Sequence, residues 1–182
     1  LPYEELVLLP GSQSSNYEVY SEILSETIVA MLSETEKYYD AVLIDATPGI
    51  DKINKKLFED ADLVVVNLSQ NIGVIDLFFR SIPEELLGKK VFYLFGSYLS
   101  DSSFNIKNLR IRYPELKMKN TGVVPMNVGF MDAISVGRLL NYFEEIFPLQ
   151  YLKYFVHFYN HFLKHNKSQH LHKHQLYSDY IL

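Results

Sequence analysis

Short, continuous apolar runs that alternate with helix-like segments constrain the fold of this chain most. The runs "AVLID" (41–45), "DLVVVNL" (62–68) and "KKVFYLFGS" (89–97) are rich in β-branched and aromatic residues. They lack a two-residue alternation, which is typical of strands buried on both faces of a parallel sheet. We therefore predict an α/β three-layer sandwich with a mainly parallel sheet.

The boundaries of the elements follow from turn residues and from apolar spacing. Strands are predicted at Leu6–Leu9, where Pro10 ends the run, and then at 41–45, 62–67, 91–96 and 122–126. Helices are predicted at about 16–37, 51–59, 74–80, 106–113, 130–136 and 138–147.

The overall composition narrows the class of protein. The 182 residues are 48% hydrophobic with a formal net charge of -5, which fits one globular domain and argues against nucleic-acid binding by overall charge. The chain has no cysteine, so it has neither disulfides nor thiolate chemistry. No apolar run reaches transmembrane length, and the start of the chain has no signal-peptide pattern. We expect a cytoplasmic location.

A change in composition divides the chain into 1–147, the predicted domain, and 148–182, an aromatic and histidine-rich tail predicted to be helical. All six histidines lie in this tail. His157, His161 and His165 share one helix face, which would suit a metal. A solvated helix face and an atypical or frame-altered terminus are the alternatives.

Polar residues follow several of the predicted strands. Asp45 ends one strand and is followed by a Thr-Pro-Gly turn, and further polar groups stand at 10–12, 67–71 and 96–98. Parallel strands bring such residues to one sheet edge, where ligands bind. One carboxylate among neutral polar groups suits Mg²⁺ with phosphates. The alternative is that Asp45 only ends a strand.

Four segments in order resemble the ParA/MinD-type (CobQ/CobB/MinD/ParA) P-loop ATPases. They are "YYDAVLIDATPG", "FEDADLVVVNLSQN", "KKVFYLFGSYLSDSSFNIKNL" and "TGVVPMNVGFMDAISVGRLLNYFEE". The resemblance covers about residues 6–147. It implies a P-loop NTPase-like fold, a cytoplasmic ATP-dependent switch that forms a homodimer, and DNA or protein cargo that the switch partitions or positions.

The resemblance also implies roles for single residues. Asp45 matches the catalytic Walker B aspartate, which supports Mg²⁺ through water, and Pro48 and Gly49 match the switch turn. The family's usual asparagine is not at the matching place in the base-recognition loop, and Met126 stands where an aromatic residue is commoner. The implied nucleotide-binding residues are Thr47, Pro48, Gly49, Ser97, Tyr98, Pro125 and Asn127.

The P-loop of the family is absent from the 182 residues. Neither G-x-x-x-x-G-K-[ST] nor a deviant lysine-glycine loop occurs, and this loop supplies most of the phosphate binding. We expect the chain to be the C-terminal part of a longer gene product that uses ATP and Mg²⁺, rather than a natural pseudo-enzyme. By itself the chain should neither hold nor hydrolyse ATP.

Two other functions remain open. One is a response-regulator receiver domain with Asp45 as phosphoacceptor, although Pro48 stands one residue too close and the required acidic pair and lysine are missing. The other is a non-catalytic interaction module with a degenerate nucleotide fold. A basic segment fits either DNA binding or a solvated helix face. Its residues are Lys107, Arg110, Arg112, Lys117 and Lys119.

Overall fold

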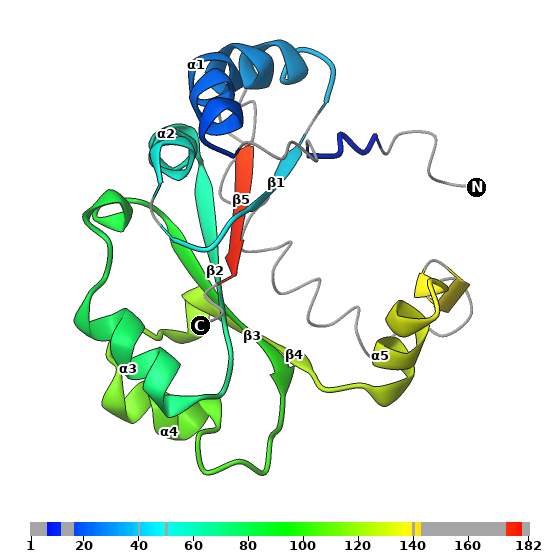
Figure 1. The fold of residues 1–182 in the computed structure, drawn as a ribbon. Helices are drawn as coiled ribbons and strands as arrows, with labels where there is room; N and C mark the ends of the chain where they lie inside the picture. Colours follow the sequence, from blue (N-terminus) through cyan, green and yellow to red (C-terminus); the bar gives the residue numbers. More distant parts are fainter. Residues whose placement is uncertain are drawn as a thin grey trace.

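The chain folds around one sheet in the computed structural model (Figure 1), which describes residues 7–11, 17–39, 41–49, 51–139, 141–142 and 174–179. The sheet has five strands in the order β1-β5-β2-β3-β4, and all four strand pairs are parallel. The strands are β1 (Val42–Ala46), β2 (Leu63–Leu68), β3 (Val91–Tyr98), β4 (Thr121–Pro125) and β5 (His174–Asp179).

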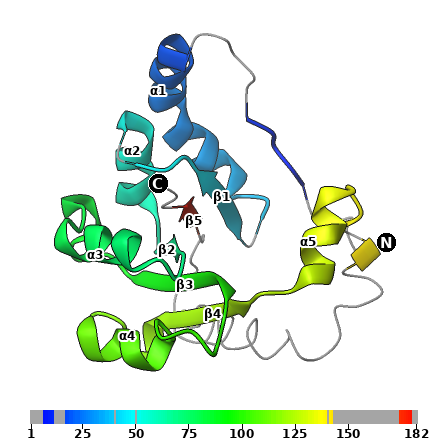
Figure 2. The same cartoon turned by 60° about the horizontal axis from the view of Figure 1, so that its bottom comes forward.

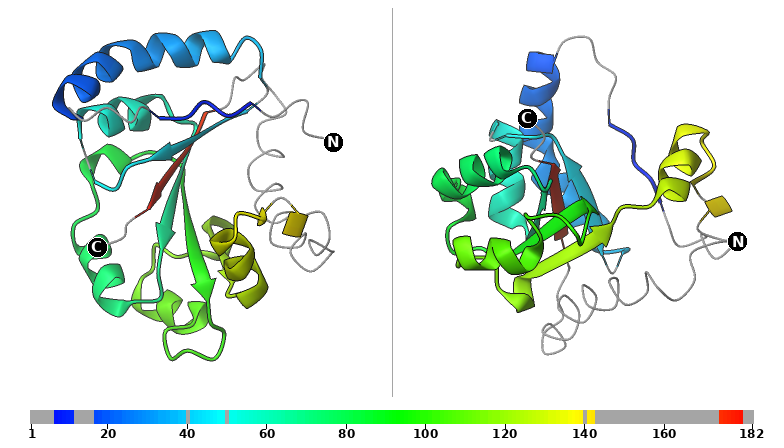
Figure 3. Two further views of the ribbon diagram at one scale, coloured as in Figure 1. Left: turned by 45° about the vertical axis from the view of Figure 1, so that its right-hand side comes forward. Right: turned by 90° about the horizontal axis from the view of Figure 1, so that it is seen from below.

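Helices connect the first four strands in sequence. The α-helices are α1 (Tyr17–Thr35), α2 (Lys52–Asp60), α3 (Ile72–Arg80), α4 (Ile106–Arg112) and α5 (Val128–Ser135), and the 3-10 helices are η1 (Glu84–Leu86) and η2 (Met118–Asn120). Helices α1 to α4 lie on one side of the sheet, and α5 lies apart from them on the other side (Figures 2 and 3).

Aspartate and asparagine side chains begin four of these helices. In each case the side-chain oxygen accepts a hydrogen bond from a backbone N–H of the first turn, which satisfies a donor that has no partner inside the helix. The capping residues are Asp51 for α2, Asn71 for α3, Asn105 for α4 and Asn127 for α5.

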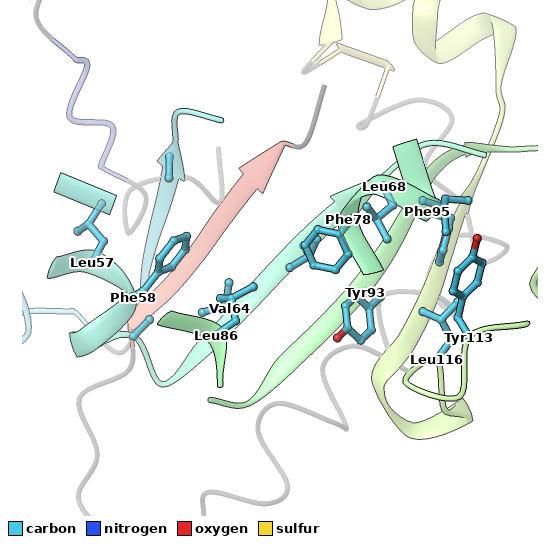
Figure 4. Close-up of a cluster of buried hydrophobic side chains, with 14 of the residues drawn as sticks. Leu57, Phe58, Val64, Leu68, Phe78, Leu86, Tyr93, Phe95, Tyr113 and Leu116 are labelled. Carbon is cyan, nitrogen blue, oxygen red and sulfur yellow. The ribbon is translucent and has the colours of Figure 1, made fainter. Parts of the chain in front are cut away.

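The main core lies between the sheet and helices α1 to α4. Alternate residues of the strands face the helices, so that Val64 and Val66 of β2 and Phe95 of β3 are at most 1% exposed. Phe58 of α2 and Phe78 of α3 fill the space over them (Figure 4). This core accounts for the position of the four helices.

A smaller apolar cluster lies on the opposite face of the sheet. It contains Leu63, Val65 and Phe92, with Leu94 packed against it. A Cβ atom on Gly122 of β4 would lie 2.9 Å from the Phe92 ring, so a side chain there would force the ring to move. Glycine lets β4 pass close to this cluster.

The predicted α/β class with a mainly parallel sheet is confirmed, and the strands expected at 41–45, 62–67 and 91–96 are present within one or two residues. The prediction of a strand at Leu6–Leu9 is wrong for residues 7–9, which are the part of it that the structure describes. Val7, Leu8 and Leu9 are 63%, 85% and 71% exposed and form no strand. An apolar run becomes a strand only where neighbouring backbone groups accept its hydrogen bonds, and residues 7–9 pair with none of the five described strands.

The prediction of a helical tail is wrong for residues 174–179, because they form β5 inside the sheet. An extended backbone between β1 and β2 satisfies the N–H and C=O groups of both neighbours, which a helix cannot do. The histidines at 157, 161, 165, 170 and 172 lie outside the described residues. The division at 147/148 stays a prediction.

A hydrogen-bonded cluster joins α3 to the end of α4. Asp76 accepts hydrogen bonds from Arg112 Nη2 at 2.8 and 2.9 Å and from the Tyr113 hydroxyl. The Tyr113 hydrogen bond and then the charge of Arg112 lower the pKa of Asp76, against the effect of desolvation. Burial, together with Asp76, raises the pKa of Tyr113 to about 12. The cluster therefore favours an ionised Asp76 beside a protonated tyrosine.

Truncating Phe95 tests the main core. Phe95→Ala should lower the free energy of unfolding by about 3–5 kcal/mol, because it removes a fully buried ring and leaves a cavity. Ile111→Ala, at a residue that is 80% exposed, is the control and should change it by less than about 0.5 kcal/mol. Chemical denaturation measures both, and equal effects would contradict the core described above.

The Asp76 cluster predicts a pH dependence of stability. A lowered pKa in the folded state means that Asp76 contributes stability above its unfolded pKa of about 3.9, and that this contribution disappears as the pH falls through the folded value. Melting temperatures between about pH 3 and 7 should therefore fall less steeply toward acid in Asp76→Asn than in the parent. Asp60→Asn, on the exposed end of α2, should keep the parental slope.

Candidate functional site

The carboxyl ends of the strands meet at one edge of the sheet, as expected for parallel strands. The predicted site residues follow three of them: 45–49 at the end of β1, 97–98 at the end of β3 and 125–127 at the end of β4. Two strands separate β1 from β3, so these two groups lie about 14 Å apart, and β4 lies one strand farther at about 19 Å. The residues share an edge without forming one compact cluster.

Asp45 is the last residue but one of β1, and its side chain is exposed. Its neighbours Ile44 and Ala46 pack into the main core, so the alternation of the strand puts Asp45 on the opposite face. Leu43, which is 59% exposed, lies on that same face. Within the described part of the chain, no hydrogen bond or ion pair engages the Asp45 carboxylate.

Asn54 of α2 holds the turn that follows Asp45. Its side chain is buried, and its Nδ2 donates to the carbonyl of Thr47 at 2.9 Å and to that of Gly49 at 2.8 Å. The capping residue Asp51 accepts from Asn54 N at 2.7 Å, and the Thr47 hydroxyl lies 3.5 Å from its second oxygen. Asn54 is not among the predicted site residues, although the Asp-x-x-Asn spacing at a helix start is a usable signal.

Gly49 takes a backbone conformation that this turn requires. Its φ of +101° lies in the region that side-chain-bearing residues rarely adopt, and there is open space where a Cβ would be. Glycine is therefore favoured at this position by the backbone angle and not by a lack of space for a side chain. The turn predicted at Pro48 and Gly49 is a fixed structure, with its two carbonyls already bonded to Asn54.

The end of β3 is irregular at the predicted Ser97 and Tyr98. Ser97 has a φ of +47°, and the register between β3 and β4 shifts between Phe95 and Tyr98. The Tyr98 carbonyl accepts from Met126 N at 3.0 Å, and its hydroxyl accepts from Ile106 N at 2.9 Å. Tyr98 thus ties α4 and the end of β4 to β3, while Ser97 is exposed and held in a strained conformation.

Gln70, which follows β2, secures the loop after β3. Its Oε1 accepts from Leu99 N at 2.6 Å, and its Nε2 donates to the carbonyls of Leu99 at 3.0 Å and Phe104 at 3.2 Å. Through these hydrogen bonds the Gln70 side chain donates and accepts as the backbone of a neighbouring strand would. The sequence placed Gln70 in a polar strand end, but only the fold shows which loop it holds.

Asn127, predicted near a bound adenine, begins α5. Its Oδ1 accepts from Phe130 N and from the Tyr142 hydroxyl, both at 2.8 Å. The Tyr142 ring also lies 3.1 Å from where a Cβ on Gly129 would be. Pro125 closes β4 and is half-buried. In this conformation Asn127 caps a helix and orients Tyr142.

The five residues of the basic segment have different surroundings in the fold. Arg112 is in the ion pair with Asp76, so its charge is partly neutralised, while Lys107, Lys117 and Lys119 are exposed. Arg110 Nε is buried without a hydrogen-bond partner in the described structure. The helix-face interpretation fits Arg112, and DNA binding by the segment stays a prediction.

The Asp45 carboxylate is available to a ligand, because it is exposed and no described residue engages it. An exposed carboxylate at a strand end can hold the water shell of a divalent cation. No group of three or more His, Asp or Glu residues suited to a metal occurs among the described residues. No helix among them is long and apolar enough to cross a membrane.

Comparison with known proteins adds no assignment. No family model, curated protein or solved structure matches the chain. The interpretation of the site therefore depends on its own residues.

Removing the Asn54 side chain tests how the turn is held. Asn54→Ala should lower the free energy of unfolding by about 1–3 kcal/mol, because the carbonyls of Thr47 and Gly49 lose their donor. Asn108→Ala removes an exposed hydrogen bond to the Ser103 carbonyl and should cost about 0.5 kcal/mol. If both variants unfold at the same denaturant concentration, Asn54 does not hold the turn.

Proposed function

We propose that this chain is part of a ParA/MinD-like ATP-dependent switch with a P-loop NTPase-like three-layer fold. The observation that carries the proposal is Asp45, an exposed carboxylate without a partner in the described residues, at the carboxyl end of a parallel strand and ahead of a rigid turn. A Walker B aspartate needs this combination, because the carboxylate must reach a hydrated cation while the following turn stays in place.

The proposed site residues are better placed to hold Mg²⁺ at Asp45 than to contact a bound nucleotide. The Thr47 hydroxyl faces Asp51 and Asn54, and Asn127 Oδ1 is engaged by Tyr142. When bound, Mg²⁺ would supply charge stabilisation for phosphoryl transfer. Asp45 would orient its water shell, and the hydrogen bonds of Asn54 would hold the turn in its position beside the ion.

The proposal includes a homodimer, DNA or protein cargo and a cytoplasmic location, as in the family that the sequence resembles. The main alternative is a non-catalytic interaction module. It is favoured by one observation: Thr47 and Asn127, two of the proposed nucleotide contacts, already take part in hydrogen bonds that hold a turn and a helix end.

The isolated chain should not bind ATP tightly. Equilibrium titration of residues 1–182 with labelled ATP and Mg²⁺ should show no micromolar binding and no turnover, because no lysine-bearing phosphate loop occurs in the sequence. Micromolar affinity would mean that another loop performs the work of the P-loop.

In the complete ATPase, or in this chain joined to a P-loop segment, Asp45→Asn should reduce hydrolysis by about 10²-fold or more. The amide keeps the shape of the carboxylate but removes the charge that orders the metal. The free energy of unfolding should change by less than about 1 kcal/mol, since the side chain is exposed. Asp60→Asn serves as the control and should keep full activity.

The outcomes of this experiment separate the alternatives. Activity that survives while stability falls would make Asp45 a structural residue. A receiver domain would instead take up phosphate from acetyl phosphate on Asp45 and lose that label in Asp45→Asn. A chain that shows neither activity, even when joined to a P-loop segment, would support the interaction module.

A further inference from the structure

The position of the Asp45 carboxylate depends on the backbone on either side of it. Asp45 is exposed, and no described residue engages its carboxylate. On its N-terminal side the backbone belongs to β1, which pairs with β5 in the described sheet. On its C-terminal side the turn at 47–49 leads directly into α2. The contacts between this turn and α2 therefore contribute to where the carboxylate lies.

Helix α2 is a firmly packed support for the turn. Three of its apolar side chains, Ile53, Leu57 and Phe58, lie in the main core and are at most 8% exposed. On the same helix the buried Asn54 uses its side-chain amide to donate to two carbonyls of the turn. The helix can hold the turn in this way only while the Asn54 side chain keeps its direction.

Asp51 fixes the direction of Asn54 through two hydrogen bonds. Its Oδ1 accepts from the Asn54 backbone N–H at 2.7 Å, which fixes the first turn of α2 from which the Asn54 side chain extends. Its Oδ2 accepts from the Thr47 hydroxyl at 3.5 Å, and that hydroxyl in turn lies 3.4 Å from Asn54 Nδ2. Asp51, Asn54 and Thr47 thus close a ring of hydrogen bonds around the turn.

We propose that Asp51 is a positioning residue of the Asp45 site, which acts through Asn54 and Thr47 to hold the turn where Asp45 can bind a hydrated cation. The inference rests on the proposed role of Asp45. Asp51 acts by accepting hydrogen bonds and does not touch the metal, so its shape matters and its charge does not. Removing a side chain that orients a metal-binding residue typically costs roughly 10–100-fold in metal affinity or activity.

Three variants of the full chain separate this role from simple stabilisation of a helix. Asp51→Ala removes the ring of hydrogen bonds. Asp51→Asn keeps an oxygen acceptor for the Asn54 N–H, because asparagine caps helices about as well as aspartate. Asn105→Ala is the matched control. It removes the cap of α4, where the side-chain oxygen accepts from Asn108 N at 3.1 Å, and α4 follows β3 instead of β1.

The readout in the full chain is the NMR signal of the Asn54 side-chain amide, which requires neither ATP nor metal. Its protons are bonded to carbonyls of the turn, so they should exchange slowly with water in the parent. Asp51→Ala should accelerate this exchange about tenfold, because opening the ring becomes easier. Asp51→Asn and Asn105→Ala should keep the parental rate. An unchanged rate in Asp51→Ala, or the same acceleration in Asn105→Ala, would overturn the proposal.

A second arm uses the chain joined to a P-loop segment. Asp51→Ala should raise the Mg²⁺ concentration for half-maximal hydrolysis about tenfold and leave kcat at saturating Mg²⁺ near the parental value, because the Asp45 carboxylate is still present. Asp51→Asn should restore the parental Mg²⁺ dependence. An equal loss in both variants would mean that Asp51 binds the metal itself, which would overturn the proposal. Hydrolysis that survives Asp45→Asn would instead overturn the proposed function, and the exchange rates would still show whether Asp51 holds the turn.

Discussion

The two hydrogen-bond ladders on either side of β5 are the interaction on which the rest of the sheet depends. Within the described structure β1 pairs only with β5 in the sheet, and β5 is the strand that hydrogen-bonds to both β1 and β2. Without a strand at this position, two rows of backbone N–H and C=O groups would lack partners in the interior of the sheet. The hydrogen-bonded connection between the strand of Asp45 and the other strands of the sheet therefore passes through β5, which is far away in sequence.

The helical layer supports this arrangement from one side only. Apolar residues of α1 to α4 cover the face formed by Ile44, Val64 and Phe95, so the order of the helices follows the order of the strands. The opposite face carries Asp45 and Leu43 in exposed positions at β1. The strand that carries the carboxylate is held in the sheet by its pairing with β5.

Most polar residues at the carboxyl edge have a structural role. Asn54 holds the turn after β1, Gln70 holds the loop after β3, and Asn127 begins α5 and contacts Tyr142. Such side chains replace hydrogen bonds that a loop backbone cannot make with a neighbouring strand. Asp45 differs because its carboxylate is exposed and has no such role in the described residues. This difference separates a ligand candidate from residues that share its edge.

The sequence by itself determined the parallel α/β class, the strands β1 to β4 and the position of Asp45 at a strand end. These features depend on local information, namely apolar runs, turn residues and helix caps. Only the tertiary structure decided that Val7–Leu9 stays outside the sheet, that His174–Asp179 enters it, and that the predicted site residues spread over three strands. Strand order and long-range pairing arise from backbone hydrogen bonds, which are the same for every residue except proline, so side-chain patterns do not reveal which segment fills a vacant position.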